Sequence, residues 1–414
     1  MRVLLLTQVL PYPPDSGPKV KTWNTLKYLS SRHDVTLISF VRGDQSADAR
    51  RLEQHCRAVH TVPLTRGALR DAVALTRSLW RGTPFLMDRD ERRRMRRVVR
   101  RITDTEPFDV VHADQLNMAS YALDVARTPR LLDAHNALWT VCKRLWEYMD
   151  AGPRRWMLGR EWRLLKQYEK HICGAFDAVL AVSPQDRASL EEAIGAPADI
   201  TVIPIAIDTH ETTPVTRRGD AGRIVYIGSL LWPPNVDGVV WFARTVLPII
   251  RGRRPNVAFD IVGATPPADV SALAQTQSGI TVAGYVANPT AILERAGVMV
   301  VPVRAGGGMR VKILTAFAQE IPVVSTTLGC EGIDATAGEH LLIADEAEPF
   351  ADAVVRVLES PTLAAQLTHN GRRLVAERYD YREACRPLDA VYERLSQHQR
   401  RQCAPQGERR GEGA

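Results

Sequence analysis

The chain contains 414 residues, of which 45% are hydrophobic and 24% are charged, and its formal net charge is +7. This composition is typical of a folded globular protein and excludes a disordered or fibrous chain, while the length predicts two or three domains. No apolar run approaches the roughly eighteen residues that a membrane-spanning helix needs. The apolar run at 2–6 is too short for a signal peptide, so we expect a first buried strand there.

The first half of the chain alternates short apolar runs with helical segments. The apolar runs occur at residues 2–6, 34–40, 108–112, 130–135 and 178–183. Helices are expected up to Ser31, through the basic region, along a tryptophan-rich stretch from Leu138 to Ile172, and from Pro184. Repeated βα units of this kind predict a doubly wound parallel sheet that binds ligands at the carboxyl ends of its strands.

Arginine is concentrated between residues 50 and 101, where fifteen arginines are accompanied by five acidic residues. The densest part is 89–101. Such a block fits a solvated helix face, an anionic membrane contact or a nucleic-acid patch. No aromatic residues are interleaved with the arginines, so we expect no nucleic-acid partner. Contact of residues 89–101 with an anionic membrane surface stays an open alternative.

The six cysteines are scattered and form neither a CxxC pair nor a cluster with histidine. Scattered thiols suit a reducing cytoplasm and argue against structural zinc. We therefore expect a cytoplasmic protein, with a peripheral position at the inner face of the membrane as an open alternative.

The second half predicts another α/β domain. A polar stretch with Pro and Gly at 209–222 predicts a linker, and apolar runs follow at 224–228, 257–263, 280–284 and 298–303. Helices are expected at 347–358 and 363–377. The predicted organisation is an N-terminal Rossmann-like domain at 1–208, the linker at 209–222, a second domain at 223–378, a helix that crosses back at 379–397, and a disordered tail at 398–414.

A glycine-rich turn in the second domain predicts an anion site. Gly306, Gly307 and Gly308 follow an apolar run, and Arg310 and Lys312 stand where a helix begins. Glycines let backbone N–H groups approach an anion, and the helix N-terminus adds partial positive charge. The alternative is an ordinary βα loop with solvent-exposed cations. The spacing matches neither a Walker loop nor a Rossmann fingerprint.

Several motifs in order resemble the donor domain of GT-B glycosyltransferases. They are the run from Gly228 to Asp237, then Gly284-Tyr285-Val286, then Gly306 to Ala316, then Pro322 to Thr326. The closest likeness is to the retaining family 4 enzymes, and it covers nearly all of residues 1–395. The resemblance implies two Rossmann-like domains facing a central cleft. It also implies a nucleotide-diphosphate sugar as co-substrate in the C-terminal domain, an acceptor in the N-terminal domain, and neither metal nor cofactor.

The resemblance also implies roles for individual residues. It places a functional histidine at His135, used against the donor sugar, with a merely hydrogen-bonded core histidine as the alternative. The residues expected at the donor are Gly228, Asn235, Gly307, Gly308, Arg310, Lys312 and Thr315. Those expected at the acceptor are Ser16, Gly17, His112 and Asp114, although capping is an equal alternative for the last two.

Thr315 departs from the family pattern. A glutamate usually stands at this position and accepts hydrogen bonds from both ribose hydroxyls, which a threonine hydroxyl cannot do. Gly307 stands where many members carry an earlier glutamate, and Glu320 stands where glycine is usual. Glu331 could offer a replacement carboxylate, or it could be an ordinary loop residue in solvent.

These features predict a hexosyltransferase-type glycosyltransferase (EC 2.4). The expected reaction moves a sugar from a nucleotide-diphosphate donor to a glycan, lipid-linked or small-molecule acceptor in polysaccharide biosynthesis, with retention and without metal. Positive groups at the leaving diphosphate would stabilise the transition state more than the ground state. Two alternatives stay open: a non-catalytic sugar-nucleotide-binding homologue, suggested by Thr315, and a nucleotide-sugar epimerase of the same fold.

Overall fold

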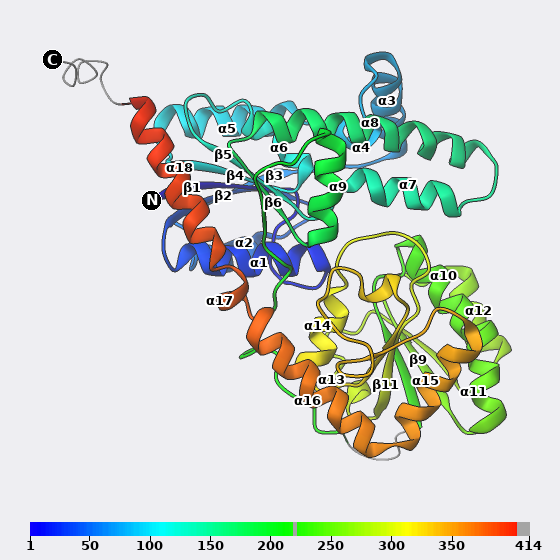
Figure 1. The fold of residues 1–414 in the computed structure, drawn as a ribbon. Coiled ribbons are helices and arrows are strands. Elements are labelled where there is room, and N and C mark those ends of the chain that lie inside the picture. The colour runs from blue at the N-terminus through cyan, green and yellow to red at the C-terminus, as the bar shows by residue number, and fades with distance from the viewer. Residues whose placement is uncertain (218–221, 404–414) are drawn as a thin grey trace. The chain divides into compact units, whose positions relative to one another are not determined.

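The computed structural model describes residues 1–217 and 222–403 and divides into two compact units (Figure 1). Unit 1 comprises Met1–Trp139, Trp156–Pro204 and the chain from Cys385 onward, and unit 2 comprises Thr140–Arg155 and Ile205–Ala384. The division therefore lies a few residues before the predicted boundary at 208. Part of the predicted linker also belongs to unit 2, because the backbone N–H of Val215 donates to the carbonyl of Gln319 at 3.0 Å. Residues 218–221 of that linker lie outside the described residues.

Unit 1 is built on seven parallel strands in the order β3-β2-β1-β4-β5-β6-β7. Its strands are β1 (Arg2–Thr7), β2 (Asp34–Val41), β3 (Ala58–Pro63), β4 (Val110–Asp114), β5 (Arg130–Ala134), β6 (Ala178–Ala181) and β7 (Ile200–Val202). The central strands are buried on both faces, as in β1, where Val3, Leu4, Leu5 and Leu6 are fully buried. This is why they read as continuous apolar runs rather than as an alternation.

The helices of unit 1 cover both faces of its sheet. They are α1 (Gly17–Ser30), α2 (Ser46–Leu52), α3 (Ala68–Arg81), α4 (Phe85–Asp90), α5 (Arg93–Thr105), α6 (Leu116–Ala122), α9 (Pro184–Ile194) and α18 (Pro387–Cys403). The predicted disordered tail is therefore wrong for its first residues, since α18 continues to Cys403. Residues 404–414 lie outside the described part of the chain.

The long helix predicted from Leu138 to Ile172 is two helices, α7 (Leu138–Tyr148) and α8 (Pro153–Ala175). The interruption precedes Pro153, whose ring disfavours the helical conformation of the residue before it and suits the first turn of a new helix. The division between the units runs through α7 and near the start of α8.

Unit 2 is built on six parallel strands in the order β10-β9-β8-β11-β12-β13. They are β8 (Arg223–Ile227), β9 (Ala258–Val262), β10 (Ile280–Gly284), β11 (Ala296–Val301), β12 (Val323–Ser325) and β13 (Leu342–Ile343). The helices are α10 (Pro233–Trp241), α11 (Leu247–Arg253), α12 (Ala268–Thr276), α13 (Thr290–Leu293), α14 (Val311–Ala318), α15 (Ala347–Glu359), α16 (Pro361–Arg378) and α17 (Tyr381–Ala384), with a π-helical turn at Phe242–Val246 and a 3-10 turn at Leu328–Cys330.

Both sheets confirm the predicted α/β class with doubly wound parallel sheets. In each, the strand order reverses beside a central strand, at β1/β4 in unit 1 and at β8/β11 in unit 2. Ligands of such sheets bind at this switch point, outside the carboxyl ends of the strands. The cleft between the domains stays a prediction. Within the described ranges, no helix is both long and apolar enough to cross a membrane.

Glu320 ends α14 in a left-handed conformation, with φ +57. Its N–H donates to the carbonyl of Phe317 and that of Ile321 to Ala316, at 3.1 and 2.9 Å, which is the Schellman pattern of helix termination. This position normally takes glycine, because a Cβ atom strains the left-handed conformation. The geometry explains why glycine is usual here.

We expect Glu320→Gly to raise the free energy of unfolding by about 1 kcal/mol, because it removes this strain. The ion pair lost with Arg372, at 3.5 Å between half-exposed groups, contributes little. Chemical denaturation measures the change. Glu320→Ala is the matched control, since it removes the same ion pair but keeps the Cβ atom. Equal stability of the two variants would contradict the strain argument.

Candidate functional site

The glycine-rich loop of unit 2 connects β11 to α14. Gly306 and Gly308 have φ of +95 and +83, which only glycine adopts without strain. Arg310 precedes the first turn of α14 and turns back onto the loop, where its Nη1 donates to the carbonyls of Gly307 (2.5 Å) and Gly308. The guanidinium thus holds the loop in shape at the N-terminus of the helix.

Lys312 lies in the first turn of α14 and reaches across to the end of β8. Its Nζ lies 3.1 Å from the hydroxyl of Tyr226 and 4.3 Å from the centre of that ring. A Cβ atom at Gly228 would collide with the Lys312 ammonium, so glycine at 228 leaves the room that the lysine occupies. The sequence motifs at 228 and 312 therefore form one packed unit.

The pKa of Lys312 is lowered to about 7, first because burial disfavours the ammonium and second because Arg310 repels it. Among the residues that the structure describes, no carboxylate lies within ion-pair distance of this ammonium. An enclosed cation without a counter-ion is costly unless an anion joins it. The geometry suits an incoming anionic group.

Thr315 lies one turn further along α14. Its hydroxyl donates to the carbonyl of Val311 at 3.2 Å, a bond within its own helix. Glu331 is not among the residues that line the cavity beside α14, and both of its oxygens accept from Arg144, at 2.6 and 2.8 Å. Arg144 also donates to the carbonyl of Gly306 at 3.2 Å, so this ion pair supports the glycine-rich loop.

The remaining donor candidates have structural contacts. Asn235 is buried, and its Nδ2 donates to the carbonyl of Ser229 at 2.8 Å, which holds the loop after β8. Gly307 has an ordinary φ, but an added Cβ atom would approach Arg144 and Val141 at 3.3 Å. A side chain at 307 would therefore need its neighbours to shift by a few tenths of an ångström, so close packing rather than a special backbone conformation favours glycine here.

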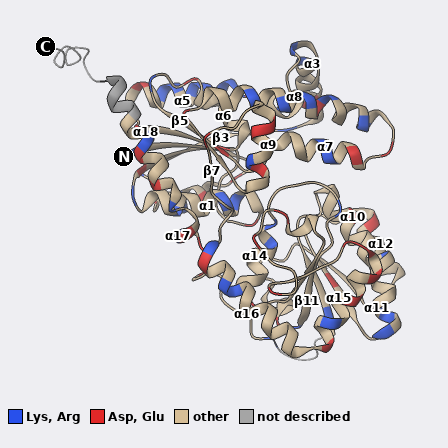
Figure 2. Ribbon diagram, viewed as in Figure 1, with Lys and Arg blue, Asp and Glu red and all other residues tan. Residues whose placement is uncertain are grey.

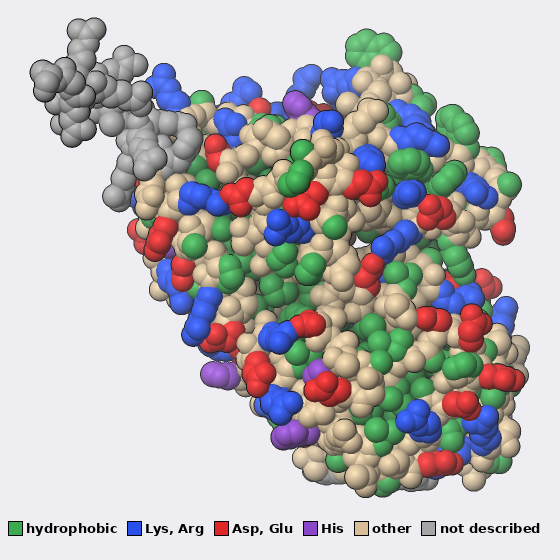
Figure 3. All heavy atoms as spheres, viewed as in Figure 1, with side chains coloured by type: hydrophobic (Ala, Val, Ile, Leu, Met, Phe, Trp, Pro, Cys, Tyr) green, Lys and Arg blue, Asp and Glu red, His purple; other side chains and the backbone are tan. Residues whose placement is uncertain are grey.

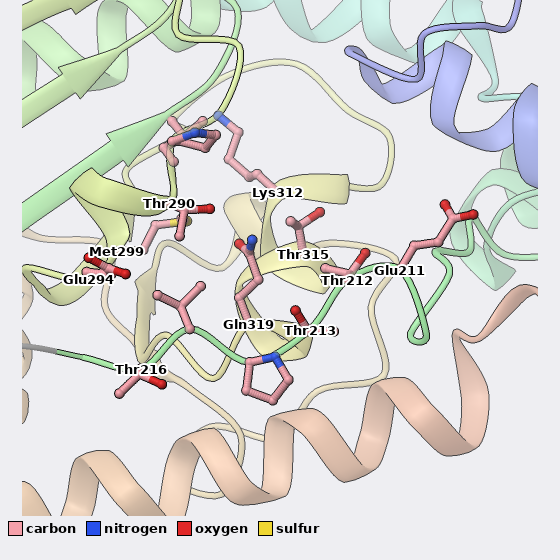
Figure 4. Close-up of a pocket in the computed structure, with 14 residues that line it drawn as sticks. Glu211, Thr212, Thr213, Thr216, Thr290, Glu294, Met299, Lys312, Thr315 and Gln319 are labelled. Carbon is pink, nitrogen blue, oxygen red and sulfur yellow. The ribbon is translucent and has the colours of Figure 1, made fainter.

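A cavity of about 560 Å³ lies beside α14 in unit 2 (Figure 4). It is lined by Lys312 and Thr315 of α14 and by Gln319 directly after that helix. Thr290 of α13, Glu294 after it and residues 211–216 of the predicted linker also line the cavity. In the close-up, the Gln319 amide and the Thr315 hydroxyl lie on the same side of α14. The sequence analysis missed Gln319, although positions 312, 315 and 319 share one helix face and this spacing could have indicated it.

In unit 1, His135 follows β5 and faces Asp114 at the end of β4. Its Nε2 lies 2.9 Å from Asp114 Oδ1, and the Thr22 hydroxyl lies 2.8 Å from Asp114 Oδ2. The Nδ1 atom of His135 is buried and has no hydrogen-bond partner among the described residues. The carboxylate thus fixes the ring while one nitrogen stays unoccupied.

Lys21 of α1 is a buried lysine, whereas Lys312 is only half-buried at its cavity. Lys21 was not predicted from the sequence, because lysine is by default exposed. Its side chain is 2% exposed, and its ammonium forms an ion pair with Asp133 at the end of β5. Burial alone would raise the pKa of Asp133, but Lys21, together with His112 and His135, holds it well below its usual range. This pair keeps the strand ends of β4 and β5 charged and fixed.

The other acceptor candidates differ in exposure. His112 and Asp114 are fully buried, and His112 Nδ1 lies 2.8 Å from the hydroxyl of Tyr392 in α18. Ser16 precedes α1 without capping it through its side chain, and Gly17 is the first helical residue. Contact of any of the four with an acceptor stays a prediction.

Asp114, Asp133 and His135 have ligand atoms within 4.8 Å of one another. A cation at this point would face the Lys21 ammonium, which already neutralises Asp133. The electrostatics of the cluster therefore disfavour a bound metal.

Comparison with known proteins agrees with this geometry. A model of "Glycosyltransferase Family 4" matches residues 17–211, and one of "Glycosyl transferases group 1" matches residues 221–360. The chain belongs to the GT-B glycosyltransferases. An "uncharacterized 44.6 kDa protein in cps region" of Klebsiella pneumoniae is 23% identical over 394 residues, covering 92% of this chain and 96% of the relative.

Solved structures share the fold. Sucrose-phosphate synthase from Thermosynechococcus elongatus superposes with a TM-score of 0.72 at 17% identity, over 96% of this chain and 100% of that one. Anabaena HepE in complex with UDP and glucose gives 0.65 at 14%, over 95% and 100%. S. aureus TarM, as a variant in complex with UDP, fondaparinux and alpha-GlcNAc-glycerol, gives 0.67 at 9%, over 94% and 99%.

We expect Lys312→Met to weaken binding of UDP or GDP at least about tenfold, because a charge-assisted hydrogen bond to an anion is worth about 1.5–3 kcal/mol. Thermal stability should not fall, since the change removes an enclosed cation without a counter-ion. Calorimetric titration and thermal unfolding measure the two effects. Arg356→Met, which removes an exposed cation of α15, is the matched control and should leave the affinity unchanged. Unchanged affinity in Lys312→Met would contradict the assignment.

Proposed function

We propose that the protein transfers a hexose from a nucleotide-diphosphate donor to a glycan, lipid-linked or small-molecule acceptor, with retention of anomeric configuration and without metal. The observation that carries the proposal is the Lys312 ammonium, enclosed between Tyr226 and Gly228 without a carboxylate partner among the described residues. HepE and TarM, which share the fold, are described in complex with UDP.

The charge change of the reaction fits this position. When the anomeric C–O bond breaks, its electrons stay on the diphosphate, which gains negative charge, and the sugar becomes oxocarbenium-like. Lys312 and the partial positive charge at the N-terminus of α14 would stabilise that charge more strongly in the transition state than in the ground state. Because the chain itself supplies positive charge there, the proposal needs no divalent cation.

The cavity beside α14 is the proposed location of the nucleoside. It extends from Lys312 past Thr315 to Gln319, so a diphosphate on Lys312 would direct the ribose and base along the helix. Thr315 offers one hydroxyl in place of the usual carboxylate. Glu294 also lines the cavity, and a carboxylate there has the chemistry to accept bonds from ribose hydroxyls.

His135 is the proposed catalytic residue of unit 1. Asp114 holds Nε2, and Nδ1 is buried without a hydrogen-bond partner among the described residues, so contact of Nδ1 with a substrate would require a movement of the ring or of its neighbours. The ion pair between Lys21 and Asp133, two residues before the histidine, fixes the strand end that positions the ring. The resemblance to the family supports this role.

Polysaccharide biosynthesis is the proposed setting, supported by the Klebsiella relative that is named for its cps region. One observation favours a second candidate function. The Thr315 hydroxyl is bonded to its own helix, which would suit a homologue that binds sugar nucleotides weakly and does not transfer the sugar.

The test is an incubation of the purified chain with UDP- and GDP-sugars in the presence of EDTA, with and without glycan and lipid-linked acceptors. Nucleotide release that depends on an acceptor, with the donor's anomeric configuration in the product by NMR, supports the proposal. Interconversion of the sugar without an acceptor would instead identify an epimerase. Binding of the nucleotide sugar in calorimetry, with neither transfer nor interconversion, would favour the non-catalytic homologue, and absence of any nucleotide binding would contradict the proposal.

We expect nucleotide binding to take up a proton above neutral pH. The pKa of Lys312 is about 7 in the free protein, and a bound diphosphate would raise it. The affinity should therefore be flat below pH 7 and decline above it, by up to about tenfold per pH unit until the bound pKa is reached. Calorimetry at pH 8 in buffers of different ionisation enthalpy measures the uptake, which Lys312→Met should lack. An affinity independent of pH between 7 and 9 would contradict this linkage.

A further inference from the structure

Helix α3 exposes large apolar side chains. Leu69, Val73 and Trp80 are 80%, 60% and 86% exposed. They are spaced at i, i+4 and i+11 and therefore share one face of the helix. Hydrophobic surface is visible at the outer end of α3 (Figure 3).

The opposite face of α3 packs with small and polar residues. Ala74 and Ser78 are buried there, and the hydroxyl and carbonyl of Ser78 accept from Arg160 of α8 at 3.1 and 2.7 Å. A surface helix normally buries its large apolar residues and exposes its polar ones. In α3 this order is inverted, and an exposed apolar face of this kind marks a surface for docking.

A second exposed tryptophan lies on the helix that supports α3. Trp156 is 67% exposed and precedes Arg160 by four residues, so the two share a face of α8. Because Arg160 contacts Ser78, this face is directed toward α3. Tryptophan is the residue most enriched where a protein meets the interface of a bilayer.

Basic residues flank the apolar face. Arg70, Arg77 and Arg81 follow one another at i, i+7 and i+11 along its edge. Arg77 and Arg81 are already paired, at 3.2 to 4.0 Å from Asp88 and Glu91, and Asp71 is a further acidic residue of α3. The excess of positive charge between residues 50 and 101 therefore comes mainly from α5. The blue segments of α3 and α5 in Figure 2 show cationic positions on both helices.

Helix α5, which carries most of the block at 89–101, has the ordinary arrangement. Its apolar residues Met95, Val99 and Ile102 are buried, while Arg100 and Arg101 are exposed. It offers charge but no apolar surface. Residues 89–101 therefore supply positive charge for the predicted membrane contact but no apolar side chains to insert into the bilayer. Helix α3 supplies such side chains.

We propose that α3 docks unit 1 on an anionic lipid bilayer, with Leu69, Val73 and Trp80 inserted below the headgroups and the exposed arginines of α5, such as Arg100 and Arg101, attracted to the lipid phosphates. The excess of arginine over acidic residues at 50–101 identifies the occupant, because a second copy of the chain would present the same positive charge. Burial of the apolar face and attraction of the arginines act together, as in other helices that lie in a membrane interface. The proposal goes beyond glycosyl transfer and does not depend on it.

The test is flotation of the purified full-length chain with vesicles of phosphatidylcholine, with and without phosphatidylglycerol. Wild type should float with the anionic vesicles and much less with the neutral ones. The triple variant Leu69→Gln, Val73→Gln, Trp80→Gln should lose flotation at least about tenfold, since it removes the inserted area but no charge. These residues are exposed, so its thermal unfolding should match wild type.

Arg100→Gln with Arg101→Gln is the matched control, because it removes charge from the neighbouring helix without touching α3. It should weaken flotation only a few-fold. Quenching of tryptophan fluorescence by brominated lipid is an independent measurement of insertion, and Trp80→Phe should reduce this quenching. Flotation of the triple variant at the wild-type level would overturn the proposal. The proposal would also be overturned if the wild type did not float and light scattering showed a dimer that the triple variant does not form. This result would identify the apolar face of α3 as a contact between copies of the chain.

Discussion

The direction of the strands determines where chemistry occurs in both units. Every strand pair in the two sheets is parallel, so all strands of a sheet end at the same edge. Residues far apart in the chain, such as Asp114 and His135 in unit 1 or Gly228 and Lys312 in unit 2, meet there because they follow neighbouring strands. The reversal of strand order leaves room at that edge, which is why polar residues can lie beside an apolar core without entering it.

Two enclosed lysines show how a partner decides the state of a buried charge. Lys21 is paired with Asp133, and the pair holds the carboxyl pKa low. Among the described residues, the Lys312 ammonium contacts the hydroxyl and ring of Tyr226 and no carboxylate, and its pKa is lowered to about 7. The first is a finished structural element, since its charge is already compensated. The charge of Lys312 is compensated only when an anion binds. The presence or absence of a counter-ion therefore distinguishes a structural lysine from a binding lysine better than burial does.

The parts of the fold that depend on local pattern were predictable from the sequence. Strands such as β1 and β11 are buried on both faces and leave a continuous apolar run, and the glycines at 306 and 308 mark left-handed turns. The elements that depend on distant partners were not. Nothing near Lys21 indicates Asp133, and nothing near Glu331 indicates Arg144, because these ion pairs join positions more than a hundred residues apart. The outward face of α3 was equally hidden, since an apolar periodicity does not reveal which side the core occupies.

The close approach of Lys312 to Gly228 has a consequence for sequence variation. A side chain at 228 would occupy the space of the ammonium, so glycine at one position and lysine at the other depend on each other. A homologue that acquires a larger residue at 228 has to shorten or redirect the side chain at 312, and the ammonium then leaves its position beside Tyr226. Glycine at 228 and lysine at 312 together distinguish related chains that keep this positive charge from those that lack it.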